Sequence, residues 1–299
     1  SKYYKPLKVF QLSSRYASSV KFSPDGTKIV LLFLSQKTIE IWDAKLEKKM
    51  HVLSDYSSTI DKLQFSPDST FIASCSYDRI IRLFDINSGV EQLRLEGHTN
   101  IVKSICFSPD GKNIVSASLD GTIRIWSVQF GQEIKRIKYL GFLLDVKYSP
   151  NGEQLISLAN DTIIRIWDVK SGDMIDTLKG HKSQVSATQF SRDGLFIVSS
   201  SSDETIRLWD ITSRAQLKQF YLNYNMIINI QFLEDEQTIV ALHNHDKILR
   251  LWDLKTGTEI QQLQGHNKNI TGIDVSPDGN IIVSSSIDET IRLWTLVNN

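Results

Sequence analysis

Seven aromatic residues recur along the chain at intervals of 41 to 43 positions: Trp42, Phe84, Trp126, Trp167, Trp209, Trp252 and Trp294. A fixed period of about 40 residues indicates a repeat architecture, in which every unit forms the same supersecondary structure. Each aromatic residue ends a short apolar run, as in residues 122–126 and 205–209, and an aspartate follows five of the seven. The fold must therefore be interpreted unit by unit.

The third unit shows the pattern of one repeat most clearly. Residues 101–107, 113–118, 122–128 and 133–138 predict four strands, because apolar residues alternate within them or fill them. The sequence Ser108-Pro109-Asp110-Gly111 predicts a tight turn between the first two strands, and Asp120-Gly121 predicts another before the third. Four antiparallel strands per unit are typical of a β-propeller blade.

These repeats resemble the WD40 repeat family, and the resemblance covers about residues 7 to 297. It implies an all-β, seven-bladed β-propeller that occupies the whole chain, residues 1–299, as one domain. The chain stops just after the third strand of the last unit, whereas residues 7–12 read like a fourth strand without a blade. We therefore expect the N-terminal strand to complete the last blade and to close the ring, which removes exposed sheet edges.

Three units carry histidine, serine, aspartate and tryptophan at one spacing, which superficially suggests a hydrolase triad. A hydrolase needs one site rather than three copies, and no Gly-x-Ser-x-Gly sequence surrounds these serines. In the WD40 family such residues form a structural hydrogen-bonded network, so the resemblance implies structural tetrads and no catalytic residue. The tetrads are His98, Ser116, Asp120 and Trp126; His181, Ser199, Asp203 and Trp209; and His266, Ser284, Asp288 and Trp294.

Other units depart from this network. Tyr56 and Tyr139 occupy the histidine position in units two and four, and Ser13 and Asn223 occupy it in units one and six. We expect units one and six to be the weakest parts of the ring, because packing must replace polar bonds there. His243, His245 and Asp246 have only a weak resemblance to a metal site, so a solvated turn is the interpretation we favour and no metal is predicted.

The resemblance also implies a docking surface on the narrower face around the central channel, to which three positions per repeat point. In units two to four and in unit six these positions are unusually apolar, and apolar residues with no core to fill suggest a partner surface. The alternative is that some of them line the channel or pack between blades. The expected partner-binding residues are Tyr77, Ile101, Lys103, Leu119, Phe142, Leu144, Asp61, Met226 and Ile228.

Composition narrows the function classes. Lys+Arg and Asp+Glu both total 34, so no net charge attracts the chain to nucleic acid or to a membrane surface. Two cysteines fit neither a disulfide framework nor zinc spacing, which favours an intracellular location, cytoplasmic or nuclear. No phosphate-binding glycine loop is present, and no cofactor is predicted.

The predicted function is a non-catalytic interaction scaffold that docks an apolar peptide or helix of another protein, as a monomeric propeller within a larger complex. The first alternative is a sensor or regulatory domain of a larger protein, for example one attached to a nucleotide-switch module. A ubiquitin-ligase substrate receptor, suggested by 167–170 and 252–255, and a propeller enzyme are further alternatives.

Overall fold

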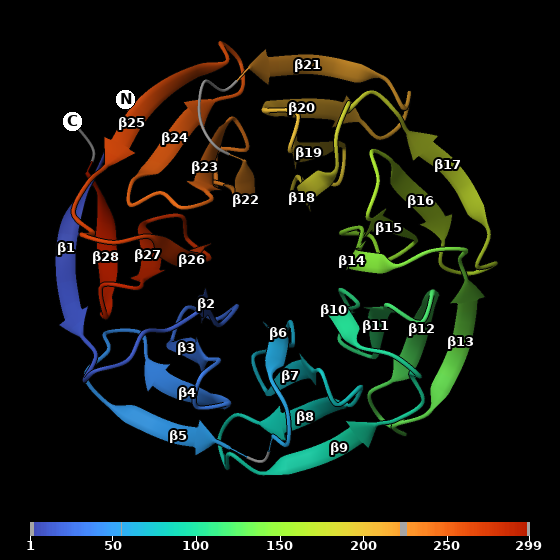
Figure 1. Ribbon diagram of the computed structural model, residues 1–299, viewed down its shortest axis with the longest axis horizontal. Helices are drawn as coiled ribbons and strands as arrows, with labels where there is room; N and C mark the ends of the chain where they lie inside the picture. Colours follow the sequence, from blue (N-terminus) through green and yellow to red (C-terminus); the bar gives the residue numbers. More distant parts are fainter. Residues whose placement is uncertain (1–2, 55, 222–225, 298–299) are drawn as a thin grey trace.

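The structure of the chain is a computed structural model that describes residues 3–54, 56–221 and 226–297. These residues form seven four-stranded antiparallel sheets, which stand as blades around a central axis (Figure 1). The described residues contain strands β1 to β28 and no α-helix, so the prediction of an all-β, seven-bladed propeller is confirmed. We number the blades one to seven by their anchors, from Trp42 to Trp294.

Each blade runs from an innermost strand at the axis to an outermost strand at the perimeter. The innermost strands are β2 (Ser19–Phe22), β6 (Ile60–Phe65), β10 (Val102–Phe107), β14 (Leu143–Tyr148), β18 (Val185–Phe190), β22 (Ile227–Phe232) and β26 (Ile270–Val275). The second strands are β3 (Lys28–Phe33), β7 (Phe71–Ser76), β11 (Asn113–Ser118), β15 (Gln154–Ala159), β19 (Phe196–Ser201), β23 (Thr238–His243) and β27 (Ile281–Ser286). The third strands are β4 (Thr38–Asp43), β8 (Ile81–Asp85), β12 (Thr122–Ser127), β16 (Ile164–Asp168), β20 (Thr205–Asp210), β24 (Leu249–Asp253) and β28 (Thr290–Val297). The outermost strands are β5 (Lys49–Leu53), β9 (Glu91–Leu95), β13 (Glu133–Lys138), β17 (Met174–Leu178), β21 (Gln216–Tyr221), β25 (Thr258–Leu263) and β1 (Tyr3–Gln11).

The first strand of the chain closes the ring. Strand β1 pairs antiparallel with β28, so the last blade has the order β1-β28-β27-β26 (Figure 1). The pairing begins at Tyr3, four residues earlier than the sequence indicated, and ends at Gln11. Tyr4 is buried, and its hydroxyl donates a hydrogen bond to the Gly279 carbonyl at 2.5 Å. The predicted closure by the N-terminal strand is therefore confirmed.

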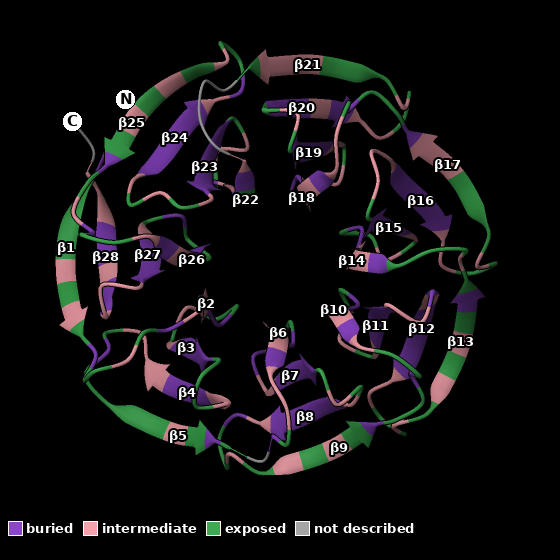
Figure 2. Ribbon diagram, viewed as in Figure 1, coloured by how far each residue is buried: buried purple, intermediate pink, exposed green. Residues whose placement is uncertain are grey.

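The hydrophobic core lies between neighbouring blades. One cluster joins Ala73, Ile81 and Leu83 of blade two to Ile105 and Trp126 of blade three. Figure 2 shows the same pattern around the ring: the second and third strands are mostly buried, whereas the outermost strands alternate between exposed and half-buried residues. A blade has little apolar surface to bury alone, so its stability depends on both neighbours.

The repeated turn sequences serve the backbone. In the turn after β10, the Ser108 hydroxyl donates to Asp110 at 2.6 Å and accepts from the Asn113 N–H at 2.9 Å. Gly111 follows with a φ of 70°, a conformation that favours glycine. The aspartate after the anchor caps the next turn, since Asp168 accepts the Ser171 N–H at 2.6 Å. The Trp-Asp pair thus couples a core anchor to a turn cap.

Candidate functional site

The three predicted tetrads form one hydrogen-bonded arrangement. In blade three, His98 Nδ1 lies 2.8 Å from Asp120 Oδ2, and His98 Nε2 lies 2.7 Å from Ser116 Oγ. Trp126 Nε1 donates to the same serine oxygen at 2.8 Å. The His–Ser and Trp–Ser distances are 2.8 and 2.8 Å in blade five, and 2.8 and 3.0 Å in blade seven.

The proton positions in the tetrad follow from the acceptors. A carboxylate only accepts, so Nδ1 of His98 carries the proton and Nε2 accepts the Ser116 hydroxyl. Burial lowers the pKa of His98 and outweighs the opposing effect of Asp120. Burial by itself would raise the pKa of Asp120, but hydrogen bonds from Thr122 and His98 lower it to about 2. At neutral pH the imidazole is therefore neutral and the carboxylate is ionised.

This geometry gives a substrate no access to the serine. Ser116, Ser199 and Ser284 are each 0% exposed. Each serine oxygen lies between an imidazole and an indole, which occupy the directions from which a substrate carbonyl would have to approach. The three sets thus connect a loop, a turn and two strands within one blade, and the contacts favour a structural role.

A threonine that the sequence analysis did not include belongs to each network. Thr122 Oγ1 lies 2.6 Å from Asp120 Oδ1 and 3.3 Å from His98 Nδ1. Thr205 and Thr290 occupy the same position in blades five and seven. The sequence contains a signal for this role, because the three units with histidine all have threonine at the start of the third strand.

Blades two and four have tyrosine in place of the histidine and isoleucine in place of that threonine. The Tyr56 hydroxyl reaches Ser74 directly at 2.5 Å. The turn aspartate then pairs with arginine, since Arg82 Nη2 lies 2.8 Å from Asp78 Oδ2 and Arg165 reaches its own turn aspartate at 2.5 Å. In the histidine blade three, the corresponding distance from Arg124 is 3.5 Å. In blades two and four the turn aspartate therefore pairs with a buried arginine instead of a buried histidine.

Blade one has a buried acid and a facing lysine at the two positions where blade three has a buried arginine and a facing glutamate. Glu40 occupies the position of Arg124 and is only 2% exposed. It accepts hydrogen bonds from Arg15 at 2.9 Å, Lys49 at 3.1 Å and the indole of Trp42 at 2.9 Å. Lys49 faces Trp42 across the β4–β5 pair, where blade three has Glu133 facing its own tryptophan. Ser13 is exposed, so the prediction that packing replaces polar bonds here is incomplete.

Blade six contains the remaining departures. Asn223 lies outside the described residues. His243 is fully buried at the end of β23, so its assignment to a solvated turn is wrong, whereas His245 is exposed. Burial and Arg250 lower the pKa of His243 to about 4, which keeps the imidazole neutral. Within the described ranges, no group of three or more His, Cys, Asp or Glu side chains is arranged to hold a metal ion.

The predicted docking residues lie in the loops and at the strand ends on the side of the ring that carries the tetrad loops. We call this side the docking face, after that prediction. Tyr77 is 42% exposed and Phe142 60% exposed, while Ile101 and Leu119 are half-buried and joined by a backbone hydrogen bond of 2.9 Å. Lys103 forms an ion pair with Asp61 at 2.8 Å, and its ammonium lies 5.3 Å from the centre of the Tyr77 ring. Residues of blades two and three are thus brought together.

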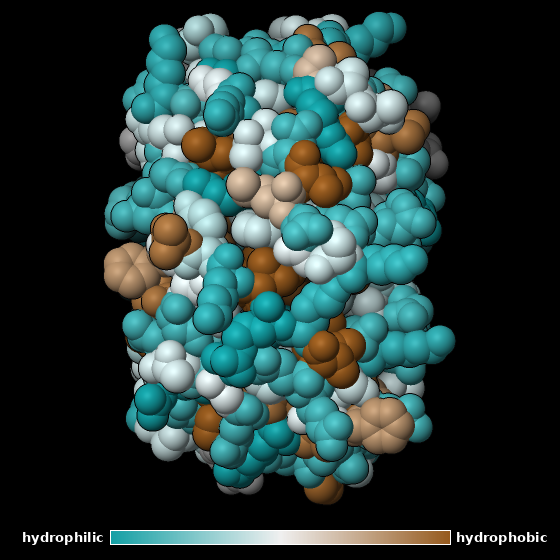
Figure 3. All heavy atoms as spheres, turned by 90° about the vertical axis from the view of Figure 1, so that its right-hand side faces the viewer, coloured by the Kyte–Doolittle hydropathy of each residue, from teal (hydrophilic) through white to brown (hydrophobic). Residues whose placement is uncertain are grey.

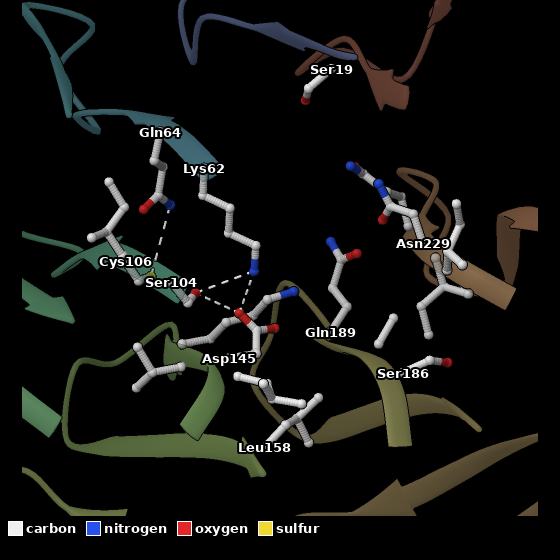
Figure 4. A pocket seen from close by; sticks show the side chains of 18 of the residues that line it. Ser19, Lys62, Gln64, Ser104, Cys106, Asp145, Leu158, Ser186, Gln189 and Asn229 are labelled. Atoms are coloured by element: carbon white, nitrogen blue, oxygen red, sulfur yellow. Dashed lines mark hydrogen bonds and ion pairs between the residues drawn. The ribbon is translucent and has the colours of Figure 1, made fainter. Parts of the chain in front are cut away.

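Four of the nine residues also line the central cavity: Asp61, Leu144, Met226 and Ile228. The cavity has a volume of about 690 Å³ and receives side chains from all seven innermost strands. Below the mouth, Lys62 Nζ lies 2.5 Å from Asp145 Oδ1, and Ser104 donates to the same oxygen at 2.5 Å (Figure 4). The channel is therefore lined by charged side chains as well as apolar ones.

The family model described as "WD domain, G-beta repeat" matches five segments of the chain: residues 47–85, 89–127, 138–168, 172–210 and 257–295. These segments make up more than half of the chain. The chain belongs to the WD40 repeat family. The matched segments contain the anchors of blades two to five and seven, so Trp42 of blade one and Trp252 of blade six fall outside them.

Individual relatives of this WD40 chain match over short segments. Nuclear distribution protein PAC1 of Candida albicans is 30% identical over 95 residues, which are 31% of this chain and 19% of that protein. The guanine nucleotide-binding protein subunit beta of Schizosaccharomyces pombe is 36% identical over 80 residues, 25% of each chain. U3 small nucleolar RNA-associated protein 21 of Saccharomyces cerevisiae is 57% identical over 35 residues, 12% of this chain and 4% of that protein. The matches span a quarter or less of these relatives.

The structure of this WD40 propeller adds residues that the sequence analysis missed. Leu140 is 101% exposed, beside Phe142 in the loop that leads into blade four. On the perimeter, Ile134, Met174 and Ile175 of the outermost strands are exposed. Figure 3 shows the hydrophobic residues on that side of the molecule mostly as separate spots among hydrophilic ones. Apolar residues scattered singly are ordinary on a protein surface, whereas a large contiguous apolar patch suggests an interaction site. Over the described ranges, no helix is long and apolar enough to cross a membrane.

Proposed function

We propose that this WD40 propeller is a non-catalytic scaffold that docks a peptide or helix of a partner protein on the docking face. The observation that carries the proposal is the exposure of Tyr77, Leu140 and Phe142, with half-buried Leu119, at this end of blades two to four. Blades two, three and four are consecutive around the ring (Figure 1). Exposed aromatic and aliphatic anchors of this kind contribute most of the binding energy at protein interfaces.

The chemistry of the face supports an apolar partner segment. Ile101 and Leu144 extend the group toward the channel, and Met226 and Ile228 stand across the channel mouth in blade six. Lys103 and Asp61 neutralise each other at 2.8 Å, which leaves the pair as polar contacts at the border. A segment that places aliphatic or aromatic side chains every three or four residues would match this surface as a helix.

A regulatory domain of a longer protein is the second candidate. The segment shared with PAC1 is 31% of this chain but 19% of PAC1, so that relative is the longer protein. The similarity to a guanine nucleotide-binding protein subunit beta also fits a propeller that works beside a nucleotide switch. Both candidates use the propeller as a binding platform, within a larger complex and without a cofactor. Free thiols at Cys75 and Cys106 fit a reducing intracellular compartment.

The test compares partners captured from source cells by wild type and by an L119E/F142D variant. The matched control is F130D, which changes a 66% exposed phenylalanine in the loop between β12 and β13, outside the docking face. Thermal melts first establish that all three proteins are folded. We expect partners to be lost with L119E/F142D and kept with F130D. If L119E/F142D kept the same partners as F130D, the proposed docking face would be contradicted.

A further inference from the structure

The central channel contains an uneven set of charges. Its lining includes the lysines Lys21, Lys62 and Lys147 and the aspartates Asp61, Asp145 and Asp274. Asp61 is neutralised from the docking face by Lys103 at 2.8 Å. Three ammonium groups then share two carboxylates within the channel, which leaves one positive charge in excess.

The hydrogen bonds show where this excess lies. Lys62 bonds Asp145 at 2.5 Å, and Lys21 lies 3.9 Å from Asp274, which also accepts the Phe22 N–H at 2.7 Å. Lys147 instead donates to the Thr188 carbonyl of the next blade at 2.5 Å. A carbonyl satisfies one ammonium proton but does not neutralise the charge. The positive charge is therefore concentrated at Lys147, with Lys62 and Lys21 near it.

The pKa shifts of Lys147 and Asp145 agree with this distribution of charge. Burial lowers the pKa of Lys147, the attraction of Asp145 only partly offsets that effect, and Lys62 and Lys21 lower the pKa further. Burial would raise the pKa of Asp145, but Lys62 and Lys147 together lower it to about 2. Asp145 is thus ionised, and the charged form of Lys147 is disfavoured in the channel, a cost that an added anion would relieve.

The remaining lining supplies uncharged donors around the same space. Figure 4 shows the amide of Gln189, from blade five, extending into the space beside Lys62 and Asp145. The cavity of about 690 Å³ is within the range of small-molecule sites. Asp145 and Asp274 each face an ammonium group, whereas Lys147 bonds a carbonyl, so the charges of the channel favour an anion over a further cation.

We propose that the central channel is a binding site for a phosphate-class oxyanion, held by Lys147 and Lys62 with Lys21 and Gln189 completing the lining. A tetrahedral anion with two charges and several acceptor oxygens matches converging ammonium and amide donors that approach from different blades. The site lies deeper than the docking face, and its occupation does not depend on a partner at that face. Bound anion would join innermost strands of blades one, two, four and five.

Inorganic phosphate and pyrophosphate, titrated calorimetrically into the full chain in chloride buffer, test the proposal. We expect saturable binding to wild type and on the order of tenfold weaker binding to K147Q, because one charge beside the anion is lost. The matched control is K135Q, since Lys135 also donates to backbone carbonyls of the next blade but lies on the perimeter. K135Q should bind like wild type. Absence of saturable binding, or equal loss in both variants, would overturn the site.

A second variant separates the charge effect from any loss of structure. D145N removes a negative charge from the channel and should bind phosphate several-fold more tightly, although it loses the ion pair with Lys62. A variant that weakened binding only through unfolding could not tighten it. D145N with unchanged or weaker phosphate affinity would contradict the proposal. L119E/F142D should keep the affinity of wild type, so this site and the docking face can fail independently.

Discussion

Replacing Glu40 with arginine would place a cation in a buried position that already faces two cations. Glu40 is 2% exposed and binds Arg15 at 2.9 Å, Lys49 at 3.1 Å and Trp42 at 2.9 Å. The substitution leaves the indole N–H without its acceptor, which costs about 1–3 kcal/mol. Repulsion from Arg15 adds up to about 4 kcal/mol at close range. The side chain of Lys49 is 40% exposed, so solvent screens its repulsion with the new arginine.

We therefore expect E40R to lower the free energy of unfolding by about 4–5 kcal/mol, and K49E alone to lower it by about 1 kcal/mol. The double variant E40R/K49E recreates in blade one the arrangement of Arg124 and Glu133, which lie 2.7 Å apart. It should be more stable than E40R by at least about 1 kcal/mol, even though K49E alone destabilises.

Urea unfolding followed by tryptophan fluorescence measures the four corners of this cycle. E40Q is the control for shape, because its amide oxygen still accepts from Trp42 while the charge is gone. The reasoning is refuted if the losses of E40R and K49E simply add within about 0.5 kcal/mol, since the charges would then not interact.

Three further predictions concern the tetrads, the ring closure and acid stability. D203A should lower the free energy of unfolding by about 1–3 kcal/mol through unsatisfied partners, and a hydrolase activity lost at full stability would contradict it. Deleting residues 1–11 should cost about 5 kcal/mol or more through the lost β1–β28 ladder, so an unchanged melting temperature would oppose it. Each lowered aspartate pKa adds stability that is complete above its ordinary value and lost as pH falls through about 2. The lowered pKa values of His98, His181 and His266 also remove stability as pH falls below 6.5, because the unfolded histidines then bind protons that the folded ones do not. The free energy of unfolding, measured with urea, should therefore fall steadily from pH 6.5 to pH 2, by roughly 2 kcal/mol per aspartate.

The period of the anchors made the fold predictable, because each unit has to bury the same aromatic residue against the same neighbour. Turn sequences such as 108–111 located strand boundaries to within a residue or two, since proline and glycine restrict the backbone locally. The tetrads recur at one spacing within a blade, and the resemblance to the WD40 family implied their hydrogen-bonded network. The pairing of threonine with histidine was visible in the sequence but acquired meaning only from the 3.3 Å contact of Thr122 with His98.

The charged channel could not be predicted in the same way. Lys62 and Asp145 are 83 positions apart, and Lys147 bonds a carbonyl 41 positions away, so no local pattern connects them. Ser13 at the histidine position indicated that unit one had lost its polar network, yet Glu40 forms another one with Arg15 and Lys49. The sequence by itself determined the blades, because their hydrogen bonds and turns are local. Only the tertiary structure decided which side chains meet across blades, because closure of the ring sets distances between residues that are far apart in the chain.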